Sequence, residues 1–197
     1  MPFSRLFSSQ RLTQCAVVMA ALAATNSVAF AHPGLHVSGF GDGLAHPFSG
    51  LDHLLAMVAV GLWAAQLGRP ATWVLPLAFP AVMAVGAVAG WSGGALPWME
   101  IGVTLSVVVL GAAVAFGFRP SLTVSAALIA VFAFFHGYTH GVELPQSASA
   151  LTYGIGFIAA TLTLHAIGLA LGTVGRGALP RVAGSAVAAM GVVLILT

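Results

Sequence analysis

The sequence predicts an all-α membrane protein, a bundle of six transmembrane helices that follows a cleavable N-terminal signal peptide. Hydrophobic residues make up 59% of the 197 residues and charged residues only 5%, whereas charged residues make up about 25% of a soluble domain. The first 31 residues have the pattern of a secretory signal. Six apolar segments follow, each near the ~20 residues that cross a bilayer.

The predicted signal peptide has the three parts expected of an exported protein. Arg5 and Arg11 precede the apolar stretch 15–24, and Ala29-Phe30-Ala31 is an A-x-A cleavage site before His32. An uncleaved first helix is the alternative. Cleavage would remove the single cysteine of the chain, and with it any disulfide or thiolate metal ligand.

The predicted organisation is therefore a signal peptide at 1–31 and a six-span domain at 32–197, of which 32–49 is a histidine-rich periplasmic lead-in. The expected spans are approximately 50–67, 71–90, 97–117, 121–140, 148–171 and 178–196. Pro76 and Pro80 predict a kink in the second span, tolerable where neighbours satisfy the freed carbonyls. The pairs Gly86/Gly90 and Gly168/Gly172 are typical of closely packed helices.

The arginines of the six-span domain predict its orientation. Export of the mature N-terminus would place the turns that hold them in the cytoplasm, as the positive-inside rule requires. These arginines are Arg69, Arg119, Arg176 and Arg181. We therefore expect a multi-pass protein of the bacterial inner membrane with both mature termini in the periplasm.

The orientation gathers ionisable side chains at the outer face. All four acidic residues of the sequence lie there: Asp42, Asp52, Glu100 and Glu143. Six of the seven histidines do too: His32, His36, His46, His53, His136 and His140. Only His165 lies deep in a span. Nitrogen and oxygen ligands without neighbouring cations attract divalent metals, and imidazole favours transition metals over Ca²⁺ or Mg²⁺.

Each of these residues also has a structural explanation. Ser49 and Asp52 fit a capping box at the first span. Glu100 follows Pro97, as an acid in the first turn of a helix commonly does. Glu143 could be a solvated loop acid, and the histidines near it could sit at the membrane interface. These readings remain open for each residue taken alone.

Spacing favours a shared metal site. His136 and His140 are four residues apart, hence on one face of a helix, and His53 and Met57 share a face in the same way. His46 is expected in a loop that folds back over the mouth of the first span. A site built from the first, third and fourth spans would hold His46, Asp52, His53, Glu100, His136 and His140.

Two motifs resemble those of the HupE/UreJ family of small nickel permeases. They are His46-x5-Asp52-His53 and Phe135-His136-Gly137-x-x-His140-Gly141-x-Glu143. The resemblance implies nickel uptake for the maturation of hydrogenase or urease. It also implies that Glu143 joins the functional residues and that Glu100 is the acid of the third span. Some members of similar sequence are assigned to cobalt, so the metal stays open.

The resulting hypothesis is a permease, not an enzyme, with no permanently bound cofactor and with Ni²⁺ or Co²⁺ as the transported ion. His32, His36 and Asp42 would form a secondary capture site, and His165 and Met57 an inner path. The chain has too few basic residues for a nucleic-acid surface, so the expected partners are the ion and the bilayer. Nickel chaperones would be reached only indirectly, and homo-oligomerisation stays open.

Two other readings remain. Three histidines and a carboxylate could hold zinc in an intramembrane hydrolase, and the chain could be a non-transporting accessory protein for metalloenzyme assembly. No P-loop motif is present, which leaves passive and gradient-coupled transport as the two alternatives for a permease.

Overall fold

The structure is a computed structural model that describes residues 39–94, 96–144, 149–175 and 178–196. The predicted signal peptide, His32, His36 and Arg176 lie outside these ranges. The described residues form helices and no strand, which confirms the all-α class. The helices are α2 (Phe40–Ser49), α3 (Leu51–Leu67), α4 (Ala71–Ser92), α5 (Met99–Phe116), α6 (Leu122–Glu143), α7 (Ala150–Val174) and α8 (Leu179–Leu196).

Helices α3 to α8 correspond to the six expected spans, with ends that differ by three residues or fewer. Five of them, α4 to α8, are long and apolar enough to cross a membrane. Helix α3 has 17 residues, and it reaches spanning length only together with α2. These two helices meet at an angle of 87° around Gly50. The pair is thus either a broken span or a re-entrant segment.

Glycines set the closest helix contacts. A Cβ on Gly86 of α4 would collide with the carbonyl of Phe134 on α6, and one on Gly168 of α7 would collide with that of Val58 on α3. Small residues let backbones approach where no hydrophobic effect drives helices together. The prediction that these glycine pairs serve helix packing is confirmed.

The expectation that His46 is a loop residue is wrong. Residues 40–49 form helix α2, with His46 in its last turn and Pro47 inside it. The reason is tertiary: a Cβ on Gly43 would collide with the Tyr153 carbonyl, and one on Gly156 with the Phe40 carbonyl. Gly43 of α2 and Gly156 of α7 are thus points of close contact between the two helices.

Both prolines of the second span lie inside the single helix α4. Pro80 has no N–H to offer the carbonyl of Pro76, four residues earlier. That carbonyl instead accepts a hydrogen bond from Nδ1 of His165 on α7, at 3.1 Å. A neighbouring helix therefore satisfies a freed carbonyl, as expected of proline in a membrane helix.

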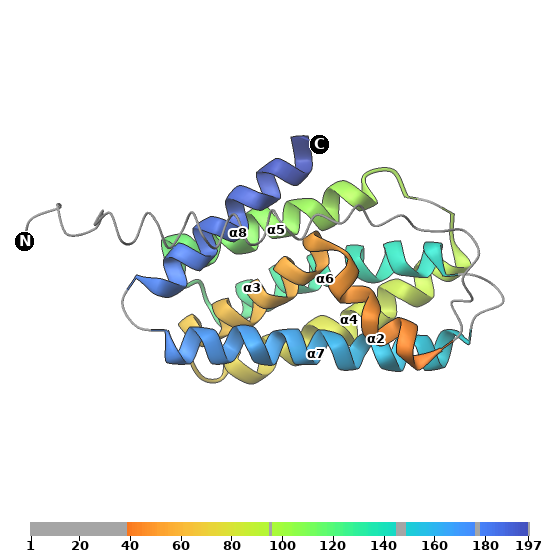
Figure 1. The fold of residues 1–197 in the computed structure, drawn as a ribbon, viewed down its shortest axis with the longest axis horizontal. Helices are drawn as coiled ribbons and strands as arrows, with labels where there is room; N and C mark the ends of the chain where they lie inside the picture. The colour runs from red at the N-terminus through yellow and green to blue at the C-terminus, as the bar shows by residue number, and fades with distance from the viewer. Residues whose placement is uncertain (1–38, 95, 145–148, 176–177, 197) are drawn as a thin grey trace, which may run out of the picture. The chain divides into compact units, whose positions relative to one another are not determined.

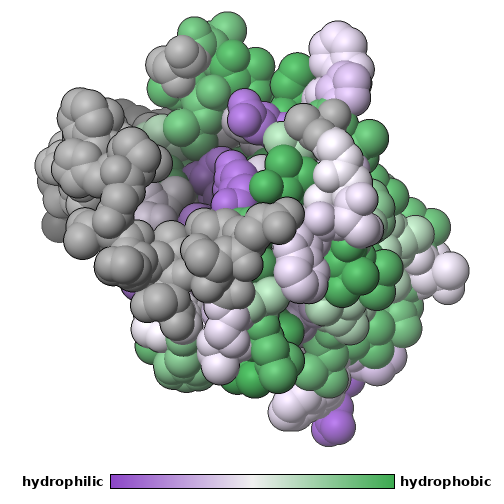
Figure 2. Space-filling model, turned by 90° about the vertical axis from the view of Figure 1, so that its right-hand side faces the viewer, coloured by the Kyte–Doolittle hydropathy of each residue, from purple (hydrophilic) through white to green (hydrophobic). Residues whose placement is uncertain are grey.

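The two ends of the bundle differ in charge. Helices α4 and α6 end, and α5 and α7 begin, at the end that lies on the right in Figure 1. Viewed from there, hydrophilic side chains gather in a hollow among apolar ones (Figure 2). Arg69, Arg119 and Arg181 are exposed and lie in the turns and helix start of the opposite end. We call these the histidine end and the arginine end.

Candidate metal site

The break between α2 and α3 places two histidines beside each other. Gly50 is extended (φ −105°, ψ 122°) and separates the last turn of α2 from the first turn of α3. His46 and His53 flank it, with ring centroids 6.3 Å apart and planes perpendicular. A helix broken near a cluster of ligands is a common arrangement for ion sites in transporters.

Asp52 orients His53. One carboxylate oxygen, Oδ1, lies 2.7 Å from His53 Nδ1 and also accepts from the His53 backbone N–H at 2.8 Å. A carboxylate partner places the imidazole proton on Nδ1 and leaves the Nε2 lone pair for a metal. His53 Nε2 is buried and makes no hydrogen bond among the described residues.

The predicted capping box at this position is wrong for Ser49, whereas Asp52 does accept from a first-turn amide of α3, the backbone N–H of His53. Ser49 donates its hydroxyl to the carbonyl of His46 in the preceding helix, and Gly50 is the N-cap of α3 without a side-chain cap. Because α2 continues to Ser49, the serine ends one helix rather than starting the next. Asp52 is left to hold His53.

The end of α6 supplies two more imidazoles. His136 is fully buried and its Nδ1 donates to the Phe132 carbonyl at 2.9 Å, whereas its Nε2 makes no hydrogen bond to the residues that the structure describes. Both ring nitrogens of His140 are buried and make no hydrogen bond in the part of the chain that the structure describes. The ring of His53 lies 5.0 Å from that of His136 and 4.5 Å from that of His140, centroid to centroid.

A second group of ligands overlaps the first at His140. One ligand atom from each of His46, His140 and Glu143 lies within 4.8 Å of the other two. Ligand atoms of one ion are about 3 to 4 Å apart, given metal–ligand bonds near 2.1 Å. A small rotation of these side chains would therefore bring them onto one ion. Glu143 lies at the end of α6 rather than in a loop.

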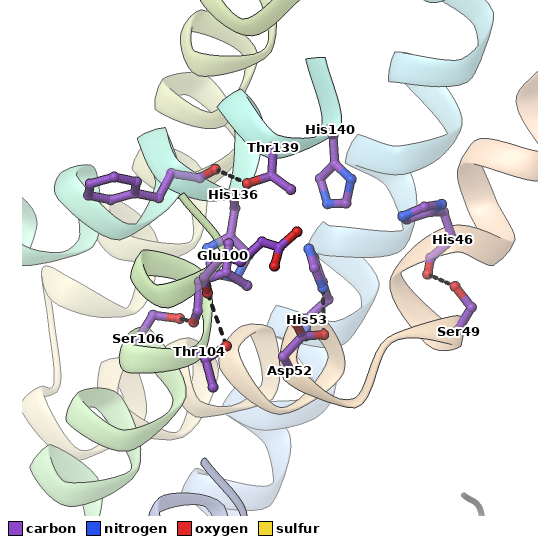
Figure 3. A network of polar contacts seen from close by, with 12 residues as sticks. His46, Ser49, Asp52, His53, Glu100, Thr104, Ser106, His136, Thr139 and His140 are labelled. Carbon is purple, nitrogen blue, oxygen red and sulfur yellow. Dashed lines mark hydrogen bonds and ion pairs between the residues drawn. The ribbon is translucent and has the colours of Figure 1, made fainter. Parts of the chain in front are cut away.

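Glu100 approaches from a third direction. It lies exposed in the first turn of α5, and in Figure 3 its carboxylate points toward the group of histidine rings. Pro97 was expected to start this helix but lies before it. Trp98 is the N-cap, with a left-handed φ of 75°, and the helix begins at the next residue. The predicted acid of the third span thus faces the site.

The structure brings most of the predicted ligands together and separates the others. We call the first set the outer cluster; it contains His46, Asp52, His53, Glu100, His136, His140 and Glu143. Asp42 is exposed in the first turn of α2. Met57 is fully buried one turn below His53, and His165 is fully buried on α7.

Aromatic residues that the sequence did not single out form one wall of the outer cluster. The ring of Phe157 lies 4.5 Å from that of His140 and 5.7 Å from that of His46, and Tyr153 lies 5.9 Å from His46. These two belong to a buried stripe on α7 with a spacing of four: Tyr153, Phe157, Thr161 and His165. That spacing is the sequence signal that could have found them.

The outer cluster can bind a divalent cation in more than one way. Its imidazoles and carboxylates suit a transition metal, and it offers more ligands than one ion needs. His140 belongs to both overlapping groups, so an ion could pass between them by exchange of ligands. Such exchange requires binding weak enough for release.

Comparison with known proteins places the chain in a family. The family model described as HupE / UreJ protein matches residues 20–194. The chain belongs to the HupE/UreJ family. It is also 46% identical over 190 residues to "Protein HupE" of Rhizobium leguminosarum bv. viciae. The aligned region covers 94% of this chain and 99% of that protein. No solved structure matches it.

Membership in the HupE/UreJ family confirms the resemblance that the two motifs carried. The match includes α2 to α7 and nearly all of α8, so both motifs lie inside the family's shared domain. In the structure these motifs supply six of the seven residues of the outer cluster.

Proposed function

We propose that this protein is a permease that takes up a divalent transition metal, Ni²⁺ first and Co²⁺ as the alternative, for the maturation of hydrogenase or urease. The observation that carries the proposal is the meeting of four imidazoles and nearby carboxylates at the break of a helix, inside an apolar bundle of a HupE/UreJ protein. Ionisable groups within a bundle are costly and are usually retained for function.

The outer cluster supports a mechanism of stepwise ligand exchange. An ion captured near Asp42 and the lead-in histidines would bind first to His46, His140 and Glu143. It would then pass to His53 and His136, whose Nε2 atoms make no hydrogen bond within the described residues. Transport by ligand exchange breaks only metal–ligand bonds and no covalent bond of a substrate, which distinguishes the proposed role from that of a zinc hydrolase.

The proposed orientation places the histidine end in the periplasm and the arginine end in the cytoplasm. The exposed arginines at one end of the bundle support it. With α2 and α3 counted as one broken span, the helices make six crossings of the inner membrane. Both mature termini are then periplasmic, after cleavage of the signal peptide at 1–31.

Uptake of radioactive nickel by cells that express only this chain tests the proposal. We expect uptake that falls to background in His140→Ala, because this residue belongs to both ligand groups, and that persists in Ser92→Ala, an exposed control on α4. Competition with unlabelled nickel, cobalt and zinc ranks the metals. A chain that reaches the membrane but moves none of these ions would contradict the proposal.

A further inference from the structure

One aromatic ring contacts both the outer cluster and the deep histidine. Phe79 of α4 is fully buried. Its ring centroid lies 5.4 Å from that of His136 and 5.3 Å from that of His165, edge to face in both cases. An ion that left His136 toward the arginine end would meet this ring before it reached His165.

His165 is held in the tautomer that can bind a metal. Its Nδ1 donates to the carbonyl of Pro76, which is available because Pro80 has no N–H. The proton therefore resides on Nδ1, and the lone pair of Nε2 is free. That nitrogen is buried and makes no hydrogen bond within the described residues.

A role restricted to helix packing explains only half of this side chain. The hydrogen bond to Pro76 accounts for Nδ1, but an asparagine could supply the same N–H. A buried nitrogen without a partner costs about 1–3 kcal/mol. This cost at Nε2 is explained if the atom binds a cation during transport.

A second unpartnered group lies beside it. Thr161 precedes His165 by four residues on the same face of α7, is fully buried, and its hydroxyl oxygen makes no hydrogen bond within the described residues. Farther along this stripe, Phe157 contacts His140 of the outer cluster. One face of α7 thus runs from the outer cluster to His165.

We propose that Nε2 of His165, with the hydroxyl of Thr161, is an inner relay site for the same divalent cation, and that the Phe79 ring is the gate between it and the outer cluster. This inference rests on the proposed transport function. The transfer exchanges a bond from His136 Nε2 for one from His165 Nε2. Both imidazoles stay neutral and the oxidation state of the ion does not change.

The inner relay site binds more weakly than the outer cluster. All four acidic residues of the sequence are at positions 42, 52, 100 and 143, so His165 and Thr161 offer only neutral ligands. A dication without a compensating charge is unfavourable in a buried site. The ion therefore stays there briefly, as conduction requires.

His165→Asn tests the inner relay site, because the asparagine amide can still donate to the Pro76 carbonyl but cannot replace Nε2. We expect wild-type nickel binding per purified chain, since the outer cluster is intact, together with loss of most uptake into cells. Thr163→Ala, exposed on the same helix, is the matched control. The inner relay site would be overturned if His165→Asn took up nickel at the wild-type rate, or if the purified variant bound less nickel than the wild type.

Cysteine accessibility tests the gate without any transport assay. In a Cys15→Ser background, Thr161→Cys should resist methanethiosulfonate ethylammonium added from the histidine end. The additional change Phe79→Ala should raise its rate of modification toward that of Thr152→Cys, which is exposed at the start of α7. Equal rates with and without Phe79→Ala would overturn the gate.

The tests of the inner relay site and of the Phe79 gate can be told apart from the test of the proposed function. A wild-type chain that moves no nickel would refute transport, and the cysteine rates would still report whether Phe79 closes the bundle. If the wild type transports and His140→Ala does not, unchanged uptake in His165→Asn would refute the inner relay site alone.

Discussion

Gly50 determines how closely Asp52 and His53 approach each other. A Cβ at this position would lie 2.8 Å from Asp52 Oδ1 and 3.1 Å from His53 Nδ1. The glycine is in an ordinary extended conformation (φ −105°), so its backbone needs no special freedom. What it provides is the space in which the carboxylate bonds to the imidazole.

We therefore expect Gly50→Ala to displace the Asp52–His53 pair and to weaken nickel binding by about 10–100-fold, as loss of an orienting partner does in other metal sites. Calorimetric titration of the purified protein with Ni²⁺ measures this effect. Gly41→Ala is the control, because a Cβ at Gly41 of α2 meets no atom within 4 Å and should leave the affinity unchanged. Equal affinities in the two variants would show that the pair does not need this space.

At the scale of elements, the docking of α2 on α7 completes the outer cluster. Helix α2 contributes His46, which reaches His140 at a centroid distance of 4.7 Å. Its close contact with α7 depends on Gly43, whose Cβ would meet backbone atoms rather than a movable side chain. The position of His46, a candidate ligand, therefore depends on the packing of two helices.

Gly43→Ala should push α2 away from α7. We expect weaker nickel binding, because His46 leaves His140 and Glu143, and a loss of about 1–3 kcal/mol in stability from overpacking. Thermal unfolding and nickel titration measure the two effects.

Gly154→Ala in α7 is the matched control for that helix contact, since a Cβ there meets nothing within 4 Å. It should change neither quantity. A folded Gly43→Ala protein with wild-type nickel affinity would mean that His46 does not contribute to binding.

At the scale of the molecule, the bundle has one end rich in ligands and one with exposed arginines. Near the arginine end, α3 is joined to the last turns of α5 and the residues after it by hydrogen bonds from Trp63 Nε1 to the Phe118 carbonyl at 2.9 Å and from Gln66 Nε2 to the Val114 carbonyl at 3.0 Å. In the proposed route for a cation, the histidine end is the side of capture and the arginine end the side of release.

The orientation can be tested with single cysteines in the Cys15→Ser background. Ser149→Cys at the histidine end should react with an impermeant thiol reagent in intact spheroplasts, whereas Arg69→Cys should react only after permeabilisation, because arginines favour the cytoplasmic side. The opposite pattern would invert the proposed topology. Mass spectrometry of the purified protein checks cleavage before His32.

The sequence by itself determined the helical class, the approximate ends of α3 to α8 and most of the candidate ligands that the structure brings together. These follow from local properties, namely apolar length, turn residues and the i, i+4 spacing of histidines on one helix. The helical state of α2, the orienting role of Asp52 and the place of Phe79 between two histidines were decided by the tertiary structure. The first and third depend on contacts between distant segments, Gly43 with Tyr153 and the ring of Phe79 with those of His136 and His165, and the second depends on the break between α2 and α3 at Gly50. Local sequence patterns carry no information about which backbones will approach closely enough to make such contacts.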